Sequence, residues 1–206
     1  MIIRIFKSGT SKGYAPVSYM MRLKDHDGSM RTVAPELLLG DPSLTIDLIN
    51  MINRKYKYTS GLISFREEET PTADQMFQII EDFRKTFLPG LDEDNFNDLW
   101  VIHSDKKNLE LHFIVVSEEL TTGKRLNISP PGIKKLEFFR TFTTVQNYKH
   151  GWKPVVGNPL NDFEYNQYLN ILEEFIDYRR VFNLKTYLTK KTSFRRPRKV
   201  SQINVI

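Results

Sequence analysis

Residues 99–116 read LWVIHSDKKNLELHFIVV, which is two apolar runs joined by a short polar segment. Successive side chains of a strand point to opposite faces, so Glu110 and His112 share one face and the apolar residues around them share the other. We expect residues 104–108 to form the turn of a hairpin, which would bring His103 close to Glu110. The stretch therefore predicts an antiparallel strand pair with one apolar face.

Two imidazoles and one carboxylate on one side of a sheet are a set of ligands typical of a divalent-cation site. The same alternation also describes an ordinary strand with one face in water, in which case Glu110 and His112 would be solvated. Asp105, in the turn, either orients a ligand imidazole or caps its own turn. The spacing leaves these alternatives open. Because the chain has no cysteine, any metal must be held by nitrogen and oxygen atoms.

The composition is that of one globular domain. The chain has 206 residues, 40% of them hydrophobic, with 14 Phe and 9 Tyr, which is enough for a substantial core and unlike a disordered protein. There is no run of eighteen apolar residues, so we expect no membrane insertion. The N-terminus, MIIRIFKSG, becomes polar too early for a signal peptide and looks like a first strand. The lack of cysteine is compatible with the cytoplasm.

The net charge of +5 is concentrated at the C-terminal end. From Arg179 onward the chain has nine basic residues and no acidic one; removing these nine from the 30 Lys and Arg leaves 21 against 25 acidic residues, about −4 for residues 1–178. A basic segment with interleaved aromatic residues suits a nucleic acid, with cations on the phosphates and rings against the bases. A solvated tail explains it equally well, and an anionic membrane surface is a weaker third interpretation.

The order of the expected elements indicates an α+β domain with a central, largely antiparallel sheet and flanking helices. Besides the hairpin, we expect strands over 1–7 and 58–65, a small apolar hairpin or loop ending near Gly40, and an edge strand over 123–128. One expected helix has Pro16 in its first turn and runs through Met21. Others span 43–55, follow a capping box at Thr72 and Gln75 until Pro89-Gly90, and span about 133–149 and 161–182. We divide the chain into a domain over 1–178 and a basic segment over 179–206, which either contacts DNA or marks the edge of a fragment of a longer protein.

Five segments resemble one family in order and spacing: GYAPVSYMM around Tyr19, KYTSGLISF at 57–65, FLPGL at 87–91, LWVIHSDKKNLELHFIV at 99–115 and ELTTGKRLNI at 119–128. The family is that of the MobA-type plasmid mobilisation relaxases, within the HUH endonucleases. The resemblance covers about the first 155 residues and does not extend over the last fifty or so. It implies a relaxase fold and a metal-dependent enzyme that nicks one strand of DNA at a plasmid origin of transfer.

The resemblance implies a role for four residues. Tyr19 matches the nucleophile, which attacks the DNA backbone and forms a 5′-phosphotyrosyl ester that can later be religated. Glu110 and the two histidines match the ligands of Mg²⁺ or Mn²⁺. The nearest subgroup has His-Glu-Asn at these positions, whereas this chain has His112 at the last one, which leaves the metal preference open. A phenol is mostly neutral at pH 7, so attack requires removal of its proton, for which Asp105 is the nearest candidate. Tyr14 is the competing nucleophile.

Further contacts and partners are also expected. Hydroxyl groups of Thr59, Ser60 and Ser64 are candidates for hydrogen bonds to phosphates, and Lys124 and Arg125 for holding the strand near the metal. Arg195 and Arg196 are the candidates in the basic tail. Each of these residues could equally be part of an ordinary solvated surface. The resemblance implies origin-of-transfer DNA, accessory mobilisation proteins and a coupling protein as partners, in the cytoplasm of a bacterium.

Two other functions fit part of the same pattern. A rolling-circle replication initiator shares the metal site and the tyrosine chemistry, but a tyrosine that precedes the metal motif favours a relaxase. A DNA-binding protein of the same fold that has lost cleavage would have no need of Tyr19 and the three ligands, and their presence together argues against it.

Overall fold

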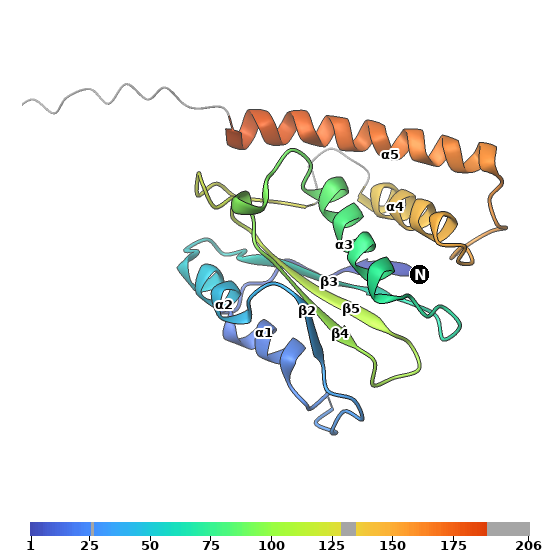
Figure 1. Ribbon diagram of the computed structural model, residues 1–206. Coiled ribbons are helices and arrows are strands. Elements are labelled where there is room, and N and C mark those ends of the chain that lie inside the picture. The colour runs from blue at the N-terminus through green and yellow to red at the C-terminus, as the bar shows by residue number, and fades with distance from the viewer. Residues whose placement is uncertain (26, 129–134, 189–206) are drawn as a thin grey trace, which may run out of the picture.

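The computed structural model describes residues 1–25, 27–128 and 135–188, and a central sheet runs through them (Figure 1). The five strands are β1 (Ile2–Ile5), β2 (Glu36–Leu39), β3 (Tyr58–Ser64), β4 (Asp98–His103) and β5 (Glu110–Val116). Their order in the sheet is β1-β3-β5-β4-β2, and every neighbouring pair is antiparallel. The predicted α+β class with an antiparallel sheet is therefore confirmed.

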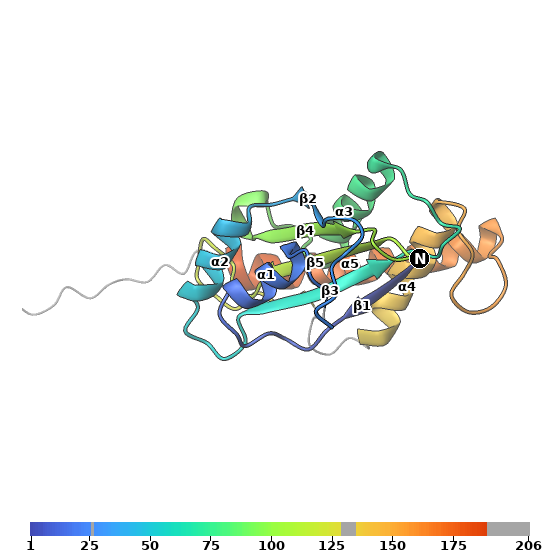
Figure 2. The same cartoon turned by 90° about the horizontal axis from the view of Figure 1, so that it is seen from below.

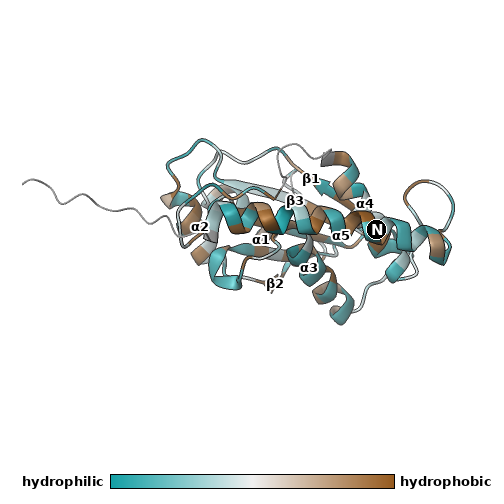
Figure 3. Ribbon diagram, turned by 90° about the horizontal axis from the view of Figure 1, so that it is seen from above, coloured by the Kyte–Doolittle hydropathy of each residue, from teal (hydrophilic) through white to brown (hydrophobic). Residues whose placement is uncertain are grey.

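Helices cover both faces of the sheet. One face carries α1 (Tyr14–Met21) and α2 (Pro42–Met51), and the other carries α3 (Ala73–Phe87), α4 (Lys135–Lys149) and α5 (Asp162–Asn183), with α5 outermost (Figures 1 and 2). Seen from above, α5 shows hydrophilic and hydrophobic residues along its exposed length (Figure 3). None of the described helices combines the length and the apolar character that crossing a membrane requires.

The helix starts follow from side chains that bind the free N–H groups of the first turn. Thr72 and Gln75 form the predicted capping box of α3, and Asn161 and Glu164 form a second one at α5. Asp41 accepts hydrogen bonds from the backbone of the first turn of α2. By contrast, α1 has no side-chain cap and directly follows Gly13, where a Cβ atom would lie 2.6 Å from the carbonyl oxygen of Ile46. Glycine at this position lets α1 begin directly against α2.

The predicted hairpin is confirmed and lies at the centre of the sheet. In the β4–β5 pair His103 lies opposite Glu110 and Val101 lies opposite His112. Leu111 and Phe113 point to the other face, where they join the larger core beneath α3 and α4. The hairpin thus separates a polar cluster on one face from the main core on the other.

Phe83 of α3 occupies the middle of this core. It is 0% exposed, and its ring lies 4.6 Å from that of Phe87, 5.0 Å from Trp100 and 4.9 Å from Phe113, centroid to centroid. The contacts with Trp100 and Phe113 join α3 to β4 and β5. Burial of a ring of this size against three others is a large contribution to the free energy of unfolding.

Replacing Phe83 by Ala should lower the free energy of unfolding by roughly 3–5 kcal/mol, because it removes buried surface and leaves a cavity. Urea unfolding followed by circular dichroism measures the change. Phe77 is on the same helix but 42% exposed, so Phe77→Ala is the matched control and should change the free energy by less than about 1 kcal/mol. Equal losses in the two variants would contradict this placement of the core.

Two parts of the sheet differ from the sequence-based expectation. The segment before Gly40 contains β2, an edge strand paired with β4, where we expected a hairpin or loop. The edge strand expected over 123–128 is wrong, because this segment pairs with none of the five strands of the sheet. The chain after β5 instead turns back through an isolated bridge between Glu119 and Lys124, with Gly123 at φ +66°.

Element ends differ by a few residues. Helix α1 begins at Tyr14, so Pro16 lies in its first turn as expected, whereas α2 ends at Met51 rather than residue 55. The expected division between residues 178 and 179 falls inside α5, which continues to Asn183 and a π-helical turn over Leu184–Leu188. Most of the predicted basic segment, including Arg195 and Arg196, lies outside the described residues.

Candidate active site

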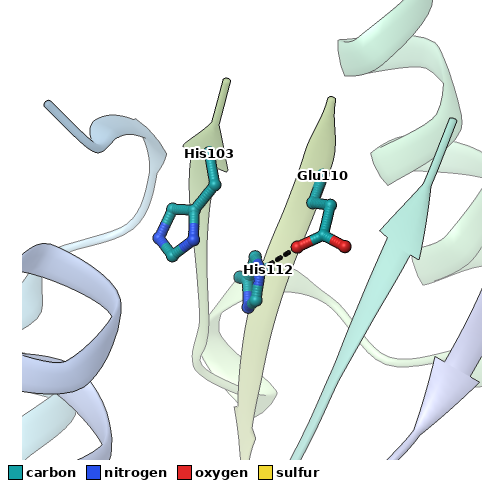
Figure 4. Close-up of side chains that lie close together, drawn as sticks. All are labelled: His103, Glu110 and His112. Carbon is teal, nitrogen blue, oxygen red and sulfur yellow. Dashed lines mark hydrogen bonds and ion pairs between the residues drawn. The ribbon is translucent and has the colours of Figure 1, made fainter. Parts of the chain in front are cut away.

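His103, Glu110 and His112 converge on the face of the sheet that carries α1 (Figure 4). One ligand atom from each can be chosen so that all three lie within 4.8 Å of one another. The two imidazole rings are 4.1 Å apart, centroid to centroid. The hairpin register therefore brings together the three residues that the sequence singled out.

The orientation of His103 is set by α1. Its Nε2 lies 2.8 Å from the backbone carbonyl oxygen of Met20. A carbonyl only accepts hydrogen bonds, so Nε2 carries the proton and Nδ1 keeps its lone pair for a metal. The carbonyl groups of the last turn of a helix have no partner within the helix, which makes the end of α1 a natural acceptor. From the sequence, Asp105 was one candidate for this orienting role.

The protonation states of the cluster suit metal binding. Burial, and then the proximity of His112, lowers the pKa of His103 below its ordinary value, so the ring is neutral at pH 7. His112 donates a hydrogen bond of 2.9 Å from Nε2 to Glu110, and this bond lowers the pKa of the Glu110 carboxyl. Neutral imidazole and ionised carboxylate are the forms that bind cations.

A small cavity of about 30 Å³ lies at the cluster, which is room for an ion or about one water. Two nitrogens and a carboxylate oxygen suit Mn²⁺ and similar cations, and they also leave coordination positions for a substrate. The donor set and the space therefore fit a divalent cation held by His103, Glu110 and His112.

Affinity for Mn²⁺ should fall as the solution becomes acidic, because protons compete for the lone pairs of the ligands. The lowered pKa of His103 and of Glu110 keeps both in their binding forms at neutral pH. Titration calorimetry should show less than about a three-fold change in affinity between pH 8 and 7, and more than about a ten-fold loss between pH 7 and 5. Affinity that does not change down to pH 5 would exclude histidine ligands.

Tyr19 lines the same cavity as the three ligands. It is 37% exposed, and the guanidinium carbon of Arg22 lies 4.9 Å from the centre of its ring. Tyr14, the competing candidate, is 70% exposed, starts the helix and does not line this cavity. Of the two tyrosines, the structure places Tyr19 next to the candidate ligands.

A network of charged groups forms another wall of the cavity. The carboxylate of Asp105 accepts a hydrogen bond of 2.9 Å from Arg31, whose other terminal nitrogen lies 3.4 Å from Asp25. Lys106 lies 2.8 Å from Asp25. The described residues show Asp105 paired with Arg31 rather than hydrogen-bonded to His103. Sequence reasoning missed Arg31 because no motif surrounds it and 74 residues separate it from Asp105.

The predicted DNA-binding hydroxyls do not share one face. Ser64 pairs with Glu110 in the β3–β5 register, and Ser60 lies on the same face four residues earlier. Thr59 points to the opposite face and is 7% exposed, so it does not border the cluster. Because successive side chains of a strand point to opposite faces, the sequence alone could have shown that Thr59 lies on the other face from Ser60 and Ser64.

Lys124 and Arg125 do not lie near the three ligands, in contrast to the expectation. They follow the far end of β5, and Glu110 and Val116 at the two ends of that strand are about 20 Å apart at 3.3 Å per residue. The amino group of Lys124 bonds the carbonyl oxygen of Thr186, and Arg125 lies 5.6 Å from the ring centre of Tyr56. This part of the prediction therefore needs correction.

A larger cavity of about 1160 Å³ lies elsewhere, between β1, α4 and α5. Its lining is mainly apolar and includes neither Tyr19 nor any of the three ligands. Size alone would select this cavity, but the cluster of ionisable groups lies in the small one. Catalysis requires groups that can bind a metal or transfer a proton, and these line the small cavity. The small cavity is therefore the candidate active site.

Comparisons with known proteins identify the family of the chain. A family model described as a MobA/VirD2-like relaxase nuclease domain matches residues 41–148. Cryptic plasmid protein C of Neisseria gonorrhoeae is 38% identical over 154 residues, which cover 74% of this chain and 71% of that protein. The DNA relaxase MbeA of Escherichia coli is 35% identical over 127 residues, which are 61% of this chain and only 23% of MbeA.

A solved structure from a study of the molecular basis of vancomycin resistance transfer in Staphylococcus aureus is also similar. It is 12% identical, covers 89% of this chain and 94% of that one, and has a TM-score of 0.38.

Proposed function

The chain belongs to the family of MobA/VirD2-like relaxase nuclease domains, and we propose that it nicks one strand of DNA at a plasmid origin of transfer and stays attached to the cut end. Membership of this family implies a DNA-nicking enzyme. The observation that carries the finer proposal is that Tyr19 lines one small cavity with His103, Glu110 and His112.

The proposed reaction is a transesterification by Tyr19. Its phenolic oxygen forms a bond to the scissile phosphorus while the bond to the 3′ oxygen breaks, and the electron pair of that bond goes to the leaving oxygen. The phenolic proton ends on the 3′ oxygen, either directly or by way of Asp105 in the same cavity. The products are a 5′-phosphotyrosyl end and a free 3′-OH, so the reverse reaction rejoins the strand without another energy source.

The surrounding residues hold the reacting groups in place. Met20 orients His103, and His112 is hydrogen-bonded to Glu110, so the ligand atoms are positioned before substrate arrives. Mg²⁺ or Mn²⁺ bound to these residues would polarise the scissile phosphate and offset charge on its oxygens. Arg22, beside the ring of Tyr19, contributes a positive charge where the phenol loses its proton.

The proposal is tested with single-stranded oligonucleotides and Mn²⁺. One oligonucleotide carries the origin of transfer of the plasmid that encodes the chain, and another carries its replication origin. We expect a DNA–protein adduct that survives SDS with the first, and none in EDTA. An adduct formed only with the replication origin would show a replication initiator instead, and binding without any adduct would show a non-catalytic DNA-binding protein.

The proposal also includes where and with what the chain acts. From the family resemblance we propose accessory mobilisation proteins and a coupling protein as partners, in the cytoplasm of a bacterium. In such a complex the basic residues after Arg179 would contact the DNA. Deleting residues 189–206 should then reduce DNA affinity and its salt dependence while leaving adduct formation at saturating DNA.

A further inference from the structure

The register of the sheet places three rows of side chains between the candidate active site and the edge of the sheet. Each row starts on β5, crosses β3 and ends on β1: Glu110–Ser64–Ile2, His112–Leu62–Arg4 and Ile114–Ser60–Phe6. Phe6 directly follows β1, and its N–H donates to the carbonyl of Ser60 at 2.9 Å. Arg4 is therefore two strand spacings, about 10 Å, from His112 on the same face.

The outer part of this face is open to solvent. Helices α1 and α2 lie over the β4 and β5 side, while β1 lies beyond them (Figure 2). Ile2 is 41% and Phe6 43% exposed, and Arg4 is exposed as well. Ile3 and Ile5 point the other way and pack against the main core. The alternation thus directs an aliphatic side chain, a cation and an aromatic ring into solvent beside the active site.

An ordinary solvent face of an antiparallel sheet is polar. Here two large apolar side chains flank Arg4, and Arg4 forms no ion pair with any of the described residues. An exposed ring next to an unpaired cation suits a nucleic acid strand, in which bases stack on rings and phosphates meet cations. The hydroxyl groups of Ser60 and Ser64 lie between these groups and the three ligands.

We propose that this β1–β3 surface, made of Ile2, Arg4, Phe6, Ser60 and Ser64, binds single-stranded DNA next to the scissile phosphate. Phe6 stacks on a base, and Arg4, about 10 Å from His112, contacts a phosphate close to the cut. The surface is adjacent to the candidate ligands, because Ser64 is the register partner of Glu110, which lines the cavity of Tyr19. The inference rests on the proposed function, since it concerns the same DNA strand.

The test measures binding separately from cleavage. Fluorescence anisotropy in EDTA, with an oligonucleotide that carries the origin of transfer, reports affinity without strand cutting. Phe6→Ala should weaken binding by roughly 5- to 100-fold, and Phe6→Trp should restore it because a ring is retained. Arg4→Ala should weaken binding and reduce the slope of log affinity against log salt by about 0.7. Phe77→Ala removes a ring of equal exposure, 42%, from α3 on the other side of the sheet and should leave affinity unchanged.

The outcomes separate this inference from the proposed function. Unchanged affinity in both Phe6→Ala and Arg4→Ala would overturn it, and the surface would then face a protein partner or solvent, even though the wild-type chain still forms its adduct. A loss in these variants but not in Phe77→Ala supports it. If the wild-type chain forms no adduct but Phe6→Ala still weakens DNA binding, the inference of a DNA-binding surface is supported and the proposed nicking activity is wrong.

Discussion

Tyr19→Phe should reduce formation of the SDS-resistant adduct by at least about a thousand-fold, because the variant lacks the oxygen that attacks phosphorus. Loss of one hydroxyl from a ring that is 37% exposed changes little in the packing of α1. DNA affinity in EDTA should therefore stay within about three-fold of the wild type. Gel electrophoresis of labelled DNA with Mn²⁺, alongside anisotropy, measures both quantities.

Tyr14→Phe is the matched control for this substitution. It removes the same atom from the other tyrosine of α1, which is 70% exposed and does not line the cavity. Its adduct should form at the wild-type rate. If instead Tyr14→Phe abolished the adduct and Tyr19→Phe did not, Tyr14 would be the nucleophile and the assignment of Tyr19 would be wrong.

His112→Ala should weaken binding of Mn²⁺ by about 100-fold or more, equivalent to about 2.7 kcal/mol. The variant loses one of the three donors and also the hydrogen bond that lowers the pKa of Glu110. Titration calorimetry gives the affinity directly. His150→Ala is the control, because His150 stacks on Trp152 and does not belong to the cluster. Equal affinities for the two variants would exclude His112 as a ligand.

His112→Asn tests the metal preference at the same position. The substitution produces the His-Glu-Asn set of the subgroup that this sequence most resembles. An amide oxygen favours hard cations such as Mg²⁺, whereas imidazole favours transition metals. The ratio of Mn²⁺ to Mg²⁺ affinity should therefore fall by about ten-fold in the variant. A ratio that does not change would show that the residue at position 112 does not decide which metal is used.

The sequence was sufficient for features that repeat with a short period. Alternation in residues 99–116 predicted the hairpin and the shared face of Glu110 and His112, and both are confirmed. The Thr72 and Gln75 pair predicted the start of α3 for the same reason, since a capping box involves residues three positions apart. Local spacing is visible in the sequence because the partners lie close together in the chain.

Features that depend on long-range contacts could not be predicted in this way. The hydrogen-bond acceptor for His103 is a backbone carbonyl 83 residues away. Every residue has such a carbonyl, so the sequence does not show which one accepts the bond. Arg31 reaches Asp105 across 74 residues. The β1–β3 surface appears only once the strand order is known, because Arg4 and His112 become neighbours through β3. The misplaced edge strand at 123–128 has the same origin, since Lys124 and Arg125 bond Thr186 and Tyr187 across 62 residues.

Helix α1 presents the Tyr19 side chain and, one residue later, the carbonyl group that holds His103. Each residue of an α-helix turns the chain by about 100°, so inserting or deleting one residue before Tyr19 would rotate both groups away together. The position of the Tyr19 hydroxyl and the orientation of the His103 ring therefore both depend on the rotation of α1 about its own axis. We infer that the length between Gly13 and Met20 tolerates no change in this chain, whereas individual side chains on the outer side of the helix are free to vary.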